Sequence, residues 1–366
     1  MVLAAGSRRR SGRRLWWVLG WLALAAAVLA VLGFDVERFL YGGARVLRVG
    51  APAGPLVVSP DGRTVYLAGS TDSITPVSAV TGKPGKPIAI GGGGRGGPGV
   101  GQLAITPDGR TLFASVFTDD PLAQLARVDL RTGREAGPVR IPGGAFDFAL
   151  SRDGATLYVA GGDDALTVVD AATGRIERRI PVLRSLAASE VAMVVSPDGG
   201  TLYLASDLLG GEITPVSLRT GAVGRAISVG WEPVSLAITP DGRTLYAAID
   251  GLEGDSGQAA PNRVVAIDTA AGRVRASLPW RAPPVYLAMA PDGTTVWVAS
   301  TVGATGSTAE NTVTPVSVAS GQPGPSFHAS GWLNTEQDGP TGIAVSPSGR
   351  TLYVTVPAGL ETFAIP

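Results

Sequence analysis

The sequence has 366 residues, of which 45% are hydrophobic and 16% are charged, so it is long enough to bury a large core. Its formal net charge is zero at pH 7, which excludes the basic surface that a nucleic-acid-binding protein presents. It contains no cysteine and a single histidine, which excludes disulfides, thiolate metal sites and cysteine nucleophiles and removes most histidine-based sites.

The N-terminal segment predicts a membrane anchor. Five arginines between Arg8 and Arg14 precede an uncharged run from Leu15 to Gly33. As a helix this run would span roughly 28 Å, close to the ~30 Å hydrocarbon core of a bilayer. Since the positive flank of an anchor stays in the cytoplasm, we expect a basic cytoplasmic tail over residues 1–14, a signal anchor over 15–34 and a linker over 35–44.

Two other interpretations of this segment stay open. Small residues between Ala25 and Ala30 offer a cleavage site, so the run could be a secretory signal that is removed, although it is longer than the usual ~7–15 residues. Arg13 and Arg14 also allow a twin-arginine signal. In each case the rest of the chain lies outside the cytoplasm, either as a single-pass membrane protein or secreted after cleavage.

A phrase of eight residues then recurs seven times. Its copies begin at Ser59, Thr106, Ser151, Ser196, Thr239, Ala290 and Ser346, at spacings of 47, 45, 45, 43, 51 and 56 residues. A repeat of this period indicates a solenoid, a propeller or an array of similar units.

Each copy predicts a hairpin. In Thr239-Pro-Asp-Gly242 the proline presets φ, the aspartate can bond its own backbone and the glycine takes a positive φ. An apolar strand precedes the turn, and a strand with β-branched and aromatic residues follows it. A second turn later in each repeat, such as Thr173-Gly174-Arg175, separates two more strands. Four antiparallel strands per repeat form a propeller blade.

The seventh repeat lacks a fourth strand, because the chain ends after a third strand near Glu361 to Ile365. The segment Arg45 to Val49 resembles a fourth strand and precedes the first repeat. The sequence therefore predicts an all-β, seven-bladed β-propeller over residues 45–366, with the last blade closed by the N-terminal strand and one transmembrane helix before it.

The repeats resemble a known family. Val234 to Tyr246 and Asn311 to Val316 are similar to the YVTN type of β-propeller repeat, and the chain resembles the YncE-like proteins over residues 45–366. The resemblance implies the fold and leaves the activity open, because such repeats encode turns and core packing.

One face of such a propeller, formed by the loops between the second and third strands and between blades, is the usual ligand face. The carboxylates expected there are Asp72, Asp119, Asp120, Asp163, Asp164, Asp207, Glu232 and Asp250. Arg281 and the tryptophans Trp231, Trp280 and Trp332 join them as ligand contacts and stacking surfaces. The carboxylates could hold Ca²⁺ or a polycationic ligand, but aspartate is also common in loops for local reasons, so no metal or cofactor is firmly predicted.

Other polar residues point to structural roles. The aspartates of the turn phrases fall on the opposite face, where we expect them to stabilise turns. His328 aligns with the outermost strand of its blade, which favours a surface histidine over a catalytic one.

These patterns favour an extracytoplasmic binding or scaffolding propeller for a protein, a peptide or a cell-envelope ligand, without catalysis. The alternative is an enzyme, since related propellers include lactonases. A metal-dependent hydrolase would use carboxylates at the channel mouth, but neither a base of near-neutral pKa nor a nucleophile motif is evident in the sequence.

Overall fold

The computed structural model describes residues 45–47, 53–69, 73–91, 100–116, 124–162, 164–182, 191–207, 210–251, 261–301, 311–329, 340–356 and 359–365. The chain divides into two compact units, Met1–Arg45 and Val46–Pro366. Within the described residues all regular elements are strands, and no helix there is long and apolar enough to cross a membrane. The predicted anchor over residues 15–34 lies outside the described residues.

The strands form seven sheets, one for each repeat. The first blade contains β2 (Ala53–Val58), β3 (Thr64–Gly69), β4 (Ser73–Ser78) and β5 (Ile88–Ala89). The second contains β6 (Val100–Ile105), β7 (Thr111–Val116), β8 (Gln124–Asp129), β9 (Arg134–Glu135) and β10 (Val139–Arg140). The third contains β11 (Asp147–Leu150), β12 (Thr156–Ala160), β13 (Ala165–Asp170) and β14 (Ile176–Pro181).

The remaining blades follow the same order. The fourth contains β15 (Val191–Val195), β16 (Thr201–Ser206), β17 (Glu212–Ser217) and β18 (Ile227–Ser228). The fifth contains β19 (Glu232–Ile238), β20 (Thr244–Asp250), β21 (Arg263–Asp268) and β22 (Arg273–Pro279). The sixth contains β23 (Pro284–Met289), β24 (Thr295–Ser300), β25 (Thr312–Ser317) and β26 (Phe327–His328). The seventh contains β27 (Gly342–Val345), β28 (Thr351–Val356), β29 (Gly359–Ala364) and β1 (Arg45–Leu47).

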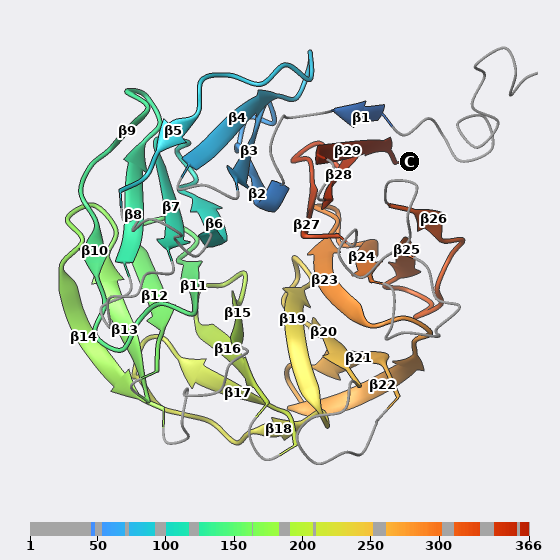
Figure 1. Ribbon diagram of the computed structural model, residues 1–366. Coiled ribbons are helices and arrows are strands. Elements are labelled where there is room, and N and C mark those ends of the chain that lie inside the picture. Colours follow the sequence, from blue (N-terminus) through green and yellow to red (C-terminus); the bar gives the residue numbers. More distant parts are fainter. Residues whose placement is uncertain are drawn as a thin grey trace, which may run out of the picture. The chain divides into compact units, whose positions relative to one another are not determined.

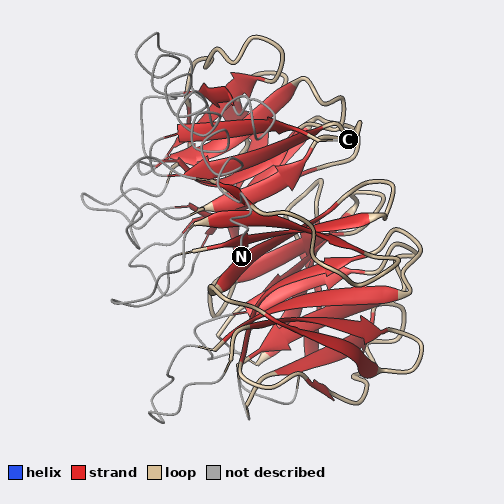
Figure 2. Ribbon diagram, turned by 90° about the vertical axis from the view of Figure 1, so that its right-hand side faces the viewer, coloured by secondary structure: helices blue, strands red, loops and turns tan. Residues whose placement is uncertain are grey.

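The blades stand in a ring, with the first strand of each at the centre (Figure 1). Each of these inner strands contacts the next one around the ring, and β27 of the last blade contacts β2 of the first. The tight turns lie on one face of the ring (right-hand side of Figure 2). The prediction of a seven-bladed propeller with four-stranded antiparallel blades is confirmed. In the second blade β9 and β10, which both pair with β8, take the place of a single fourth strand.

The seventh blade contains a strand that precedes the first blade in the sequence. Its sheet has the order β1-β29-β28-β27, so β1 is the outer strand beside β29. The predicted closure of the last blade by the N-terminal strand is therefore confirmed for Arg45–Leu47, while Arg48 and Val49 lie outside the described residues. This pairing covers the edge of β29, which would otherwise expose unpaired backbone groups.

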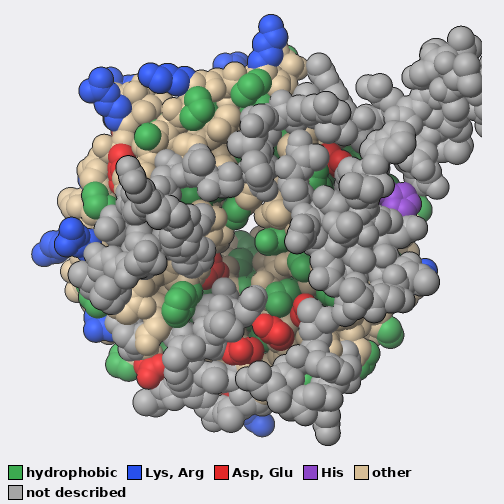
Figure 3. All heavy atoms as spheres, viewed as in Figure 1, with side chains coloured by type: hydrophobic (Ala, Val, Ile, Leu, Met, Phe, Trp, Pro, Cys, Tyr) green, Lys and Arg blue, Asp and Glu red, His purple; other side chains and the backbone are tan. Residues whose placement is uncertain are grey.

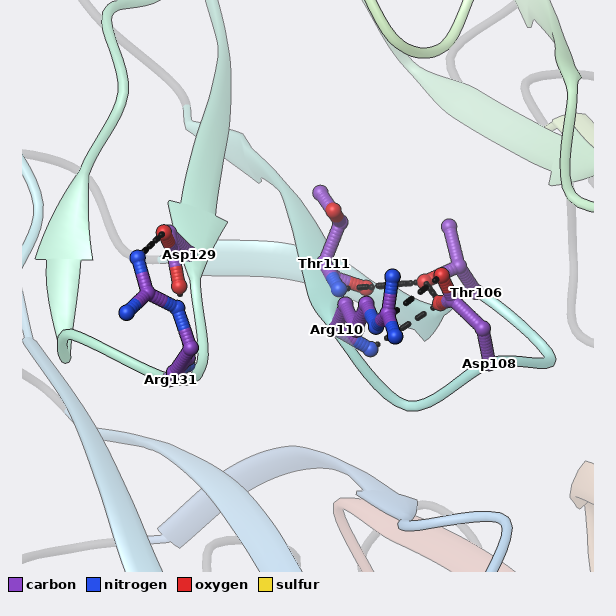
Figure 4. A network of polar contacts seen from close by, with 6 residues as sticks. All are labelled: Thr106, Asp108, Arg110, Thr111, Asp129 and Arg131. Carbon is purple, nitrogen blue, oxygen red and sulfur yellow. Dashed lines mark hydrogen bonds and ion pairs between the residues drawn. The ribbon is translucent and has the colours of Figure 1, made fainter.

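The repeated phrase forms a hydrogen-bonded turn (Figure 4). In the second blade the Thr106 hydroxyl donates to Asp108 Oδ1 over 2.6 Å, and the Arg110 backbone N–H donates to the same oxygen over 3.0 Å. Gly109 has a φ of 70°, in the left-handed region that glycine tolerates best. The Thr111 N–H donates to the Thr106 hydroxyl over 3.0 Å. The structural role expected of these aspartates is confirmed.

The hydrophobic core lies between the blades. Tyr203 and Ile213 of the fourth blade pack with Leu245 and Ile249 of the fifth. Similar clusters lie between neighbouring blades from the first to the fourth and between the fifth and sixth. In a further cluster Val65 and Leu67 of the first blade meet Tyr353 and Leu360 of the seventh. Since burial of one such side chain contributes about 1.5–3 kcal/mol, each blade depends on its two neighbours.

The turn aspartates predict a specific acid sensitivity. The Thr239 hydroxyl and then the Arg243 N–H, by donating to Asp241, lower the pKa of its carboxyl. We expect Asp241→Ala to lower the free energy of unfolding by about 1 kcal/mol near neutral pH, because two hydrogen bonds are lost. Asp241→Asn, which keeps an acceptor, is the matched control and should lose less.

Urea unfolding at several pH values checks this prediction. The stabilisation by the Asp241 carboxylate is present above its unfolded pKa, near 3.8, and is lost as the pH falls through its lowered folded value. The difference between the wild type and Asp241→Ala should therefore shrink in acid. A difference that stays constant would contradict the assigned role.

Candidate functional site

A central channel runs between the inner strands (Figure 3). Its cavity of about 320 Å³ is lined by residues on or next to the inner strand of every blade, from Pro55 and Leu56 in the first to Ile343 in the seventh. This volume is at the lower end of the ~300–1,000 Å³ typical of small-molecule pockets. Each blade therefore contributes to one shared site.

The turns determine which backbone groups face the channel. In the third blade the Ser151 N–H donates to the Thr156 carbonyl over 2.8 Å, which makes this pair a hydrogen-bonded one. Hydrogen-bonded and non-hydrogen-bonded pairs alternate along an antiparallel ladder. The pair Phe148↔Val159 is therefore non-hydrogen-bonded, and the Phe148 N–H points away from β12. β11 is the inner edge strand of its sheet, so this N–H points out of the sheet on its channel side.

Side chains of the preceding blade accept hydrogen bonds from three such N–H groups. Gln102 Oε1 accepts from the Phe148 N–H over 3.2 Å. Asp147 Oδ2 accepts from the Met193 N–H over 2.7 Å, and the Ser235 hydroxyl accepts from the Leu287 N–H over 3.1 Å. We call the N–H groups of Phe148, Met193 and Leu287 the capped amides.

The capping side chains share one place in the repeat, four residues before the turn phrase begins. We call it the inner position. Its seven residues are Pro55, Gln102, Asp147, Ala192, Ser235, Tyr286 and Gly342. The inner position thus links neighbouring blades and lines the channel.

Among the three capping side chains, Asp147 is the one with a carboxyl group. Its side chain is 8% exposed, and its Oδ1 accepts from the Phe148 N–H over 2.8 Å. Burial raises the pKa of Asp147 to about 8, since desolvation outweighs the two backbone hydrogen bonds that favour the charged form. Asp147 and Tyr286 are the titratable side chains among the described residues that line the channel.

Asp147 was not among the predicted site residues. Those residues were expected in loops, whereas Asp147 is the first residue of β11, within the blade. Alignment of the seven turn phrases would have shown one acidic residue at the inner position, beside proline, alanine, glycine and neutral polar residues. An aspartate in an otherwise apolar strand is the signal that could have found it.

The structure brings only some of the predicted carboxylates together. Asp72, Asp119, Asp120 and Asp163 lie outside the described residues. Glu232 and Asp250 are directly opposite each other on β19 and β20, and Asp250 is 8% exposed. Asp207 follows β16 and is half-buried, whereas Asp164 is exposed before β13. Within the described parts of the chain, no three acidic or histidine side chains form a group that could hold a metal ion.

The predicted tryptophan and arginine contacts that the structure describes do not line the channel cavity. Trp231, with a φ of 61°, packs against the core between the fourth and fifth blades. The Trp280 indole N–H donates to the Ser300 hydroxyl over 2.9 Å. Trp280, Arg281 and His328 line a separate groove of about 530 Å³ between β22 and β25, and His328 lies in the outer strand β26, as expected. Trp332 lies outside the described residues.

Comparison with known proteins supports the fold. No protein-family model matches the sequence, and no curated protein sequence matches it. Among solved structures, the chain is similar to Kuenenia stuttgartiensis hydrazine synthase, with a TM-score of 0.69 and 22% sequence identity. The match covers 87% of this chain and 97% of that one. At this identity the likeness shows a shared propeller fold.

The buried carboxyl predicts an unusual dependence of stability on pH. Because the pKa of Asp147 rises from 3.8 in the unfolded chain to about 8 on folding, its contribution is fully present below the lower value. It is lost as the pH rises through the higher value. We expect the urea midpoint of the wild type to fall between about pH 5 and pH 9, and Asp147→Asn to remove most of this fall.

Asp164→Asn is the control, because it makes the same chemical change at an exposed aspartate that does not line the channel cavity. Parallel curves for the wild type and Asp147→Asn would show that Asp147 does not titrate in this range.

Proposed function

We propose that this protein is a membrane-anchored, extracytoplasmic propeller of the YVTN, YncE-like kind that binds a small ligand in its central channel. The observation that carries the proposal is a cavity of ligand size that is lined by all seven blades and contains one buried carboxyl, Asp147. A rigid ring with a polar centre is suited to present fixed hydrogen-bonding groups to a ligand without rearrangement. The proposed partner is a cell-envelope molecule, a protein or a peptide.

Anchoring and location rest on the arginines before Leu15 and the apolar run that follows them. The absence of cysteine makes these proposals easy to test by single-cysteine labelling. Val80 is 77% exposed on a turn of the first blade, and Ser7 lies in the basic tail. In intact cells a membrane-impermeant maleimide should label Val80→Cys, whereas Ser7→Cys should react only after lysis. Labelling of both variants before lysis, or of neither, would contradict the proposed orientation.

A hydrolase is the second candidate, and Asp147 is the observation that favours it. A carboxyl with a pKa of about 8 holds its proton at neutral pH and could act as a general acid. The metal-dependent version would require carboxylates at the channel mouth, and Glu232 and Asp250, which lie opposite each other on β19 and β20, are its candidates. The carboxyl of Asp147 already accepts two backbone hydrogen bonds, one from Phe148 in its own strand and one from Met193 in the next blade, which supports a structural and binding role instead.

One screen separates binding from hydrolysis. The full chain, in a neutral detergent, is tested against a panel of small polar metabolites, esters and lactones for a shift in melting temperature and for turnover. Ala192→Tyr should fill part of the channel, because a tyrosine, Tyr286, already occupies the equivalent position of the sixth blade. The binding account predicts a thermal shift that Ala192→Tyr abolishes, and no turnover. Turnover that Asp147→Asn removes would establish the hydrolase instead.

A further inference from the structure

The groove between the fifth and sixth blades is a second candidate binding site. It has a volume of about 530 Å³ and lies beside β22 and β26, the outer strands of their sheets (Figure 1). An aromatic ring, hydroxyl groups and basic side chains line it, and none of the described lining residues is acidic. The polar and aromatic ones are Trp280, Arg281, Thr312, Thr314, Ser326 and His328. We call this site the tryptophan groove.

Trp280 is held in place by its backbone and by its ring. Its backbone N–H donates to the Asn262 carbonyl over 2.8 Å, and its indole N–H donates to the Ser300 hydroxyl of the sixth blade over 2.9 Å. Ser300 is fully buried, and part of the indole packs against the hydrophobic core between the two blades. The half-buried indole therefore keeps one orientation, and the groove offers an aromatic surface that needs no rearrangement on binding.

The other wall of the groove includes a bulge at the outer edge of the sixth blade. Val313 pairs with Phe327 in the ladder, and Val316 forms an isolated bridge with Pro323. Two residues of β25 thus face three residues of the outer segment, and the extra residue makes a bulge. Along this stretch β25 has no regular partner strand, and side chains from both segments line the groove.

Hydroxyl and basic side chains surround this bulge. The Thr314 and Ser326 hydroxyls are hydrogen-bonded to each other over 2.6 Å. Thr312 and His328 are directly opposite each other in the ladder, so their side chains lie on the same face of the sheet. Arg281, which is exposed, comes from the fifth-blade side, next to the indole in the sequence. Groups that donate and accept hydrogen bonds therefore share one groove with a fixed aromatic ring.

We propose that the tryptophan groove binds an acidic saccharide, with a sugar ring on the indole of Trp280 and its carboxylate at Arg281. A pyranose ring has an apolar C–H face that can pack on an aromatic ring, and its hydroxyl groups exchange hydrogen bonds with serine and threonine. The guanidinium fork matches the geometry of a carboxylate, and none of the described lining residues is acidic and would repel it. This site is separate from the channel, so the inference goes beyond the proposed function.

A groove between the second and third blades shows why charge alone does not define the ligand. It also has a volume of about 530 Å³, and its charged lining residues are Arg110, Arg127, Arg131 and Asp129. It holds more basic groups, but none of the described residues that line it is aromatic. We call it the arginine groove. A ligand recognised by charge alone would favour this site, whereas one that stacks a ring favours the tryptophan groove.

Protection of an introduced cysteine locates the ligand, because the chain has no cysteine of its own. In the full chain, in a detergent without a sugar headgroup, Ser326→Cys places a thiol in the tryptophan groove. Ala226→Cys places one at the equivalent position of the fourth blade. Hexagalacturonate at ~10 times its Kd should slow maleimide labelling of Ser326→Cys about tenfold and leave Ala226→Cys unchanged. Unchanged labelling of Ser326→Cys, or equal slowing of both variants, would overturn the inference.

Matched variants separate the two grooves. In calorimetric titrations with hexagalacturonate, Arg281→Gln should bind about tenfold more weakly than the wild type, because charge-assisted hydrogen bonds are lost. Arg131→Gln makes the same change in the arginine groove and should bind like the wild type. An equal loss in both variants, or no loss in Arg281→Gln, would contradict the assignment.

Matched probes separate ring stacking from charge. Maltohexaose has sugar rings without carboxylates, so it should bind more weakly than hexagalacturonate and should be insensitive to Arg281→Gln. Hexaglutamate has carboxylates without sugar rings and should not protect Ser326→Cys. Protection by hexaglutamate equal to that by hexagalacturonate would show that charge alone drives binding, and would overturn the saccharide assignment.

The channel variant Ala192→Tyr keeps this inference distinct from the proposed function. Hexagalacturonate should bind Ala192→Tyr as it binds the wild type, because Ala192 lines the channel and not the tryptophan groove. Loss of binding in Ala192→Tyr would place the saccharide in the channel. That result would contradict the groove assignment and support the proposed function.

Discussion

The structure depends on how the backbone N–H groups at the inner edge of each blade are hydrogen-bonded. A four-stranded sheet has two edges, and the inner strand has no strand partner on its channel side. Closing the sheets into a ring turns seven such edges into one wall. Each inner strand then presents an N–H that a side chain of the preceding blade, water or a ligand must satisfy. The same constraint connects the packing of the ring to the chemistry of its centre.

The turn phrases determine which backbone groups of the inner strands are left unpaired within the sheet. The hydrogen bond between the first and sixth residues of each phrase, such as Ser59 to Thr64, fixes which pairs in the hairpin are hydrogen-bonded. It thereby determines which N–H points into the channel, three residues before the phrase. The aspartate within the phrase stabilises the turn and, through it, the register. Residues on one face of the propeller thus determine the donors at its centre.

The fold could be predicted from the sequence because its determinants are local and repeated. Proline, aspartate and glycine at fixed places in each phrase define a turn wherever they occur, and the missing fourth strand of the last repeat pointed to Arg45. The site could not be predicted in the same way. Asp147 differs from the other carboxylates because it is buried between two blades, and burial depends on contacts between residues far apart in the sequence, such as Asp147 and Met193. Loop carboxylates such as Asp164 were selected for their charge, and the structure leaves Asp164 exposed.

Hydrogen exchange of the inner-strand amides in the ligand-free protein would show whether side chains at the inner position protect the channel wall. The N–H groups of Leu56, Leu103 and Leu236 follow inner positions without a side-chain acceptor, namely Gly342, Pro55 and Ala192. They should exchange faster than the capped amides of Phe148, Met193 and Leu287, although all six occupy the same place in the repeat. Equal protection of the two sets would show that the inner position does not control hydrogen bonding at the channel wall.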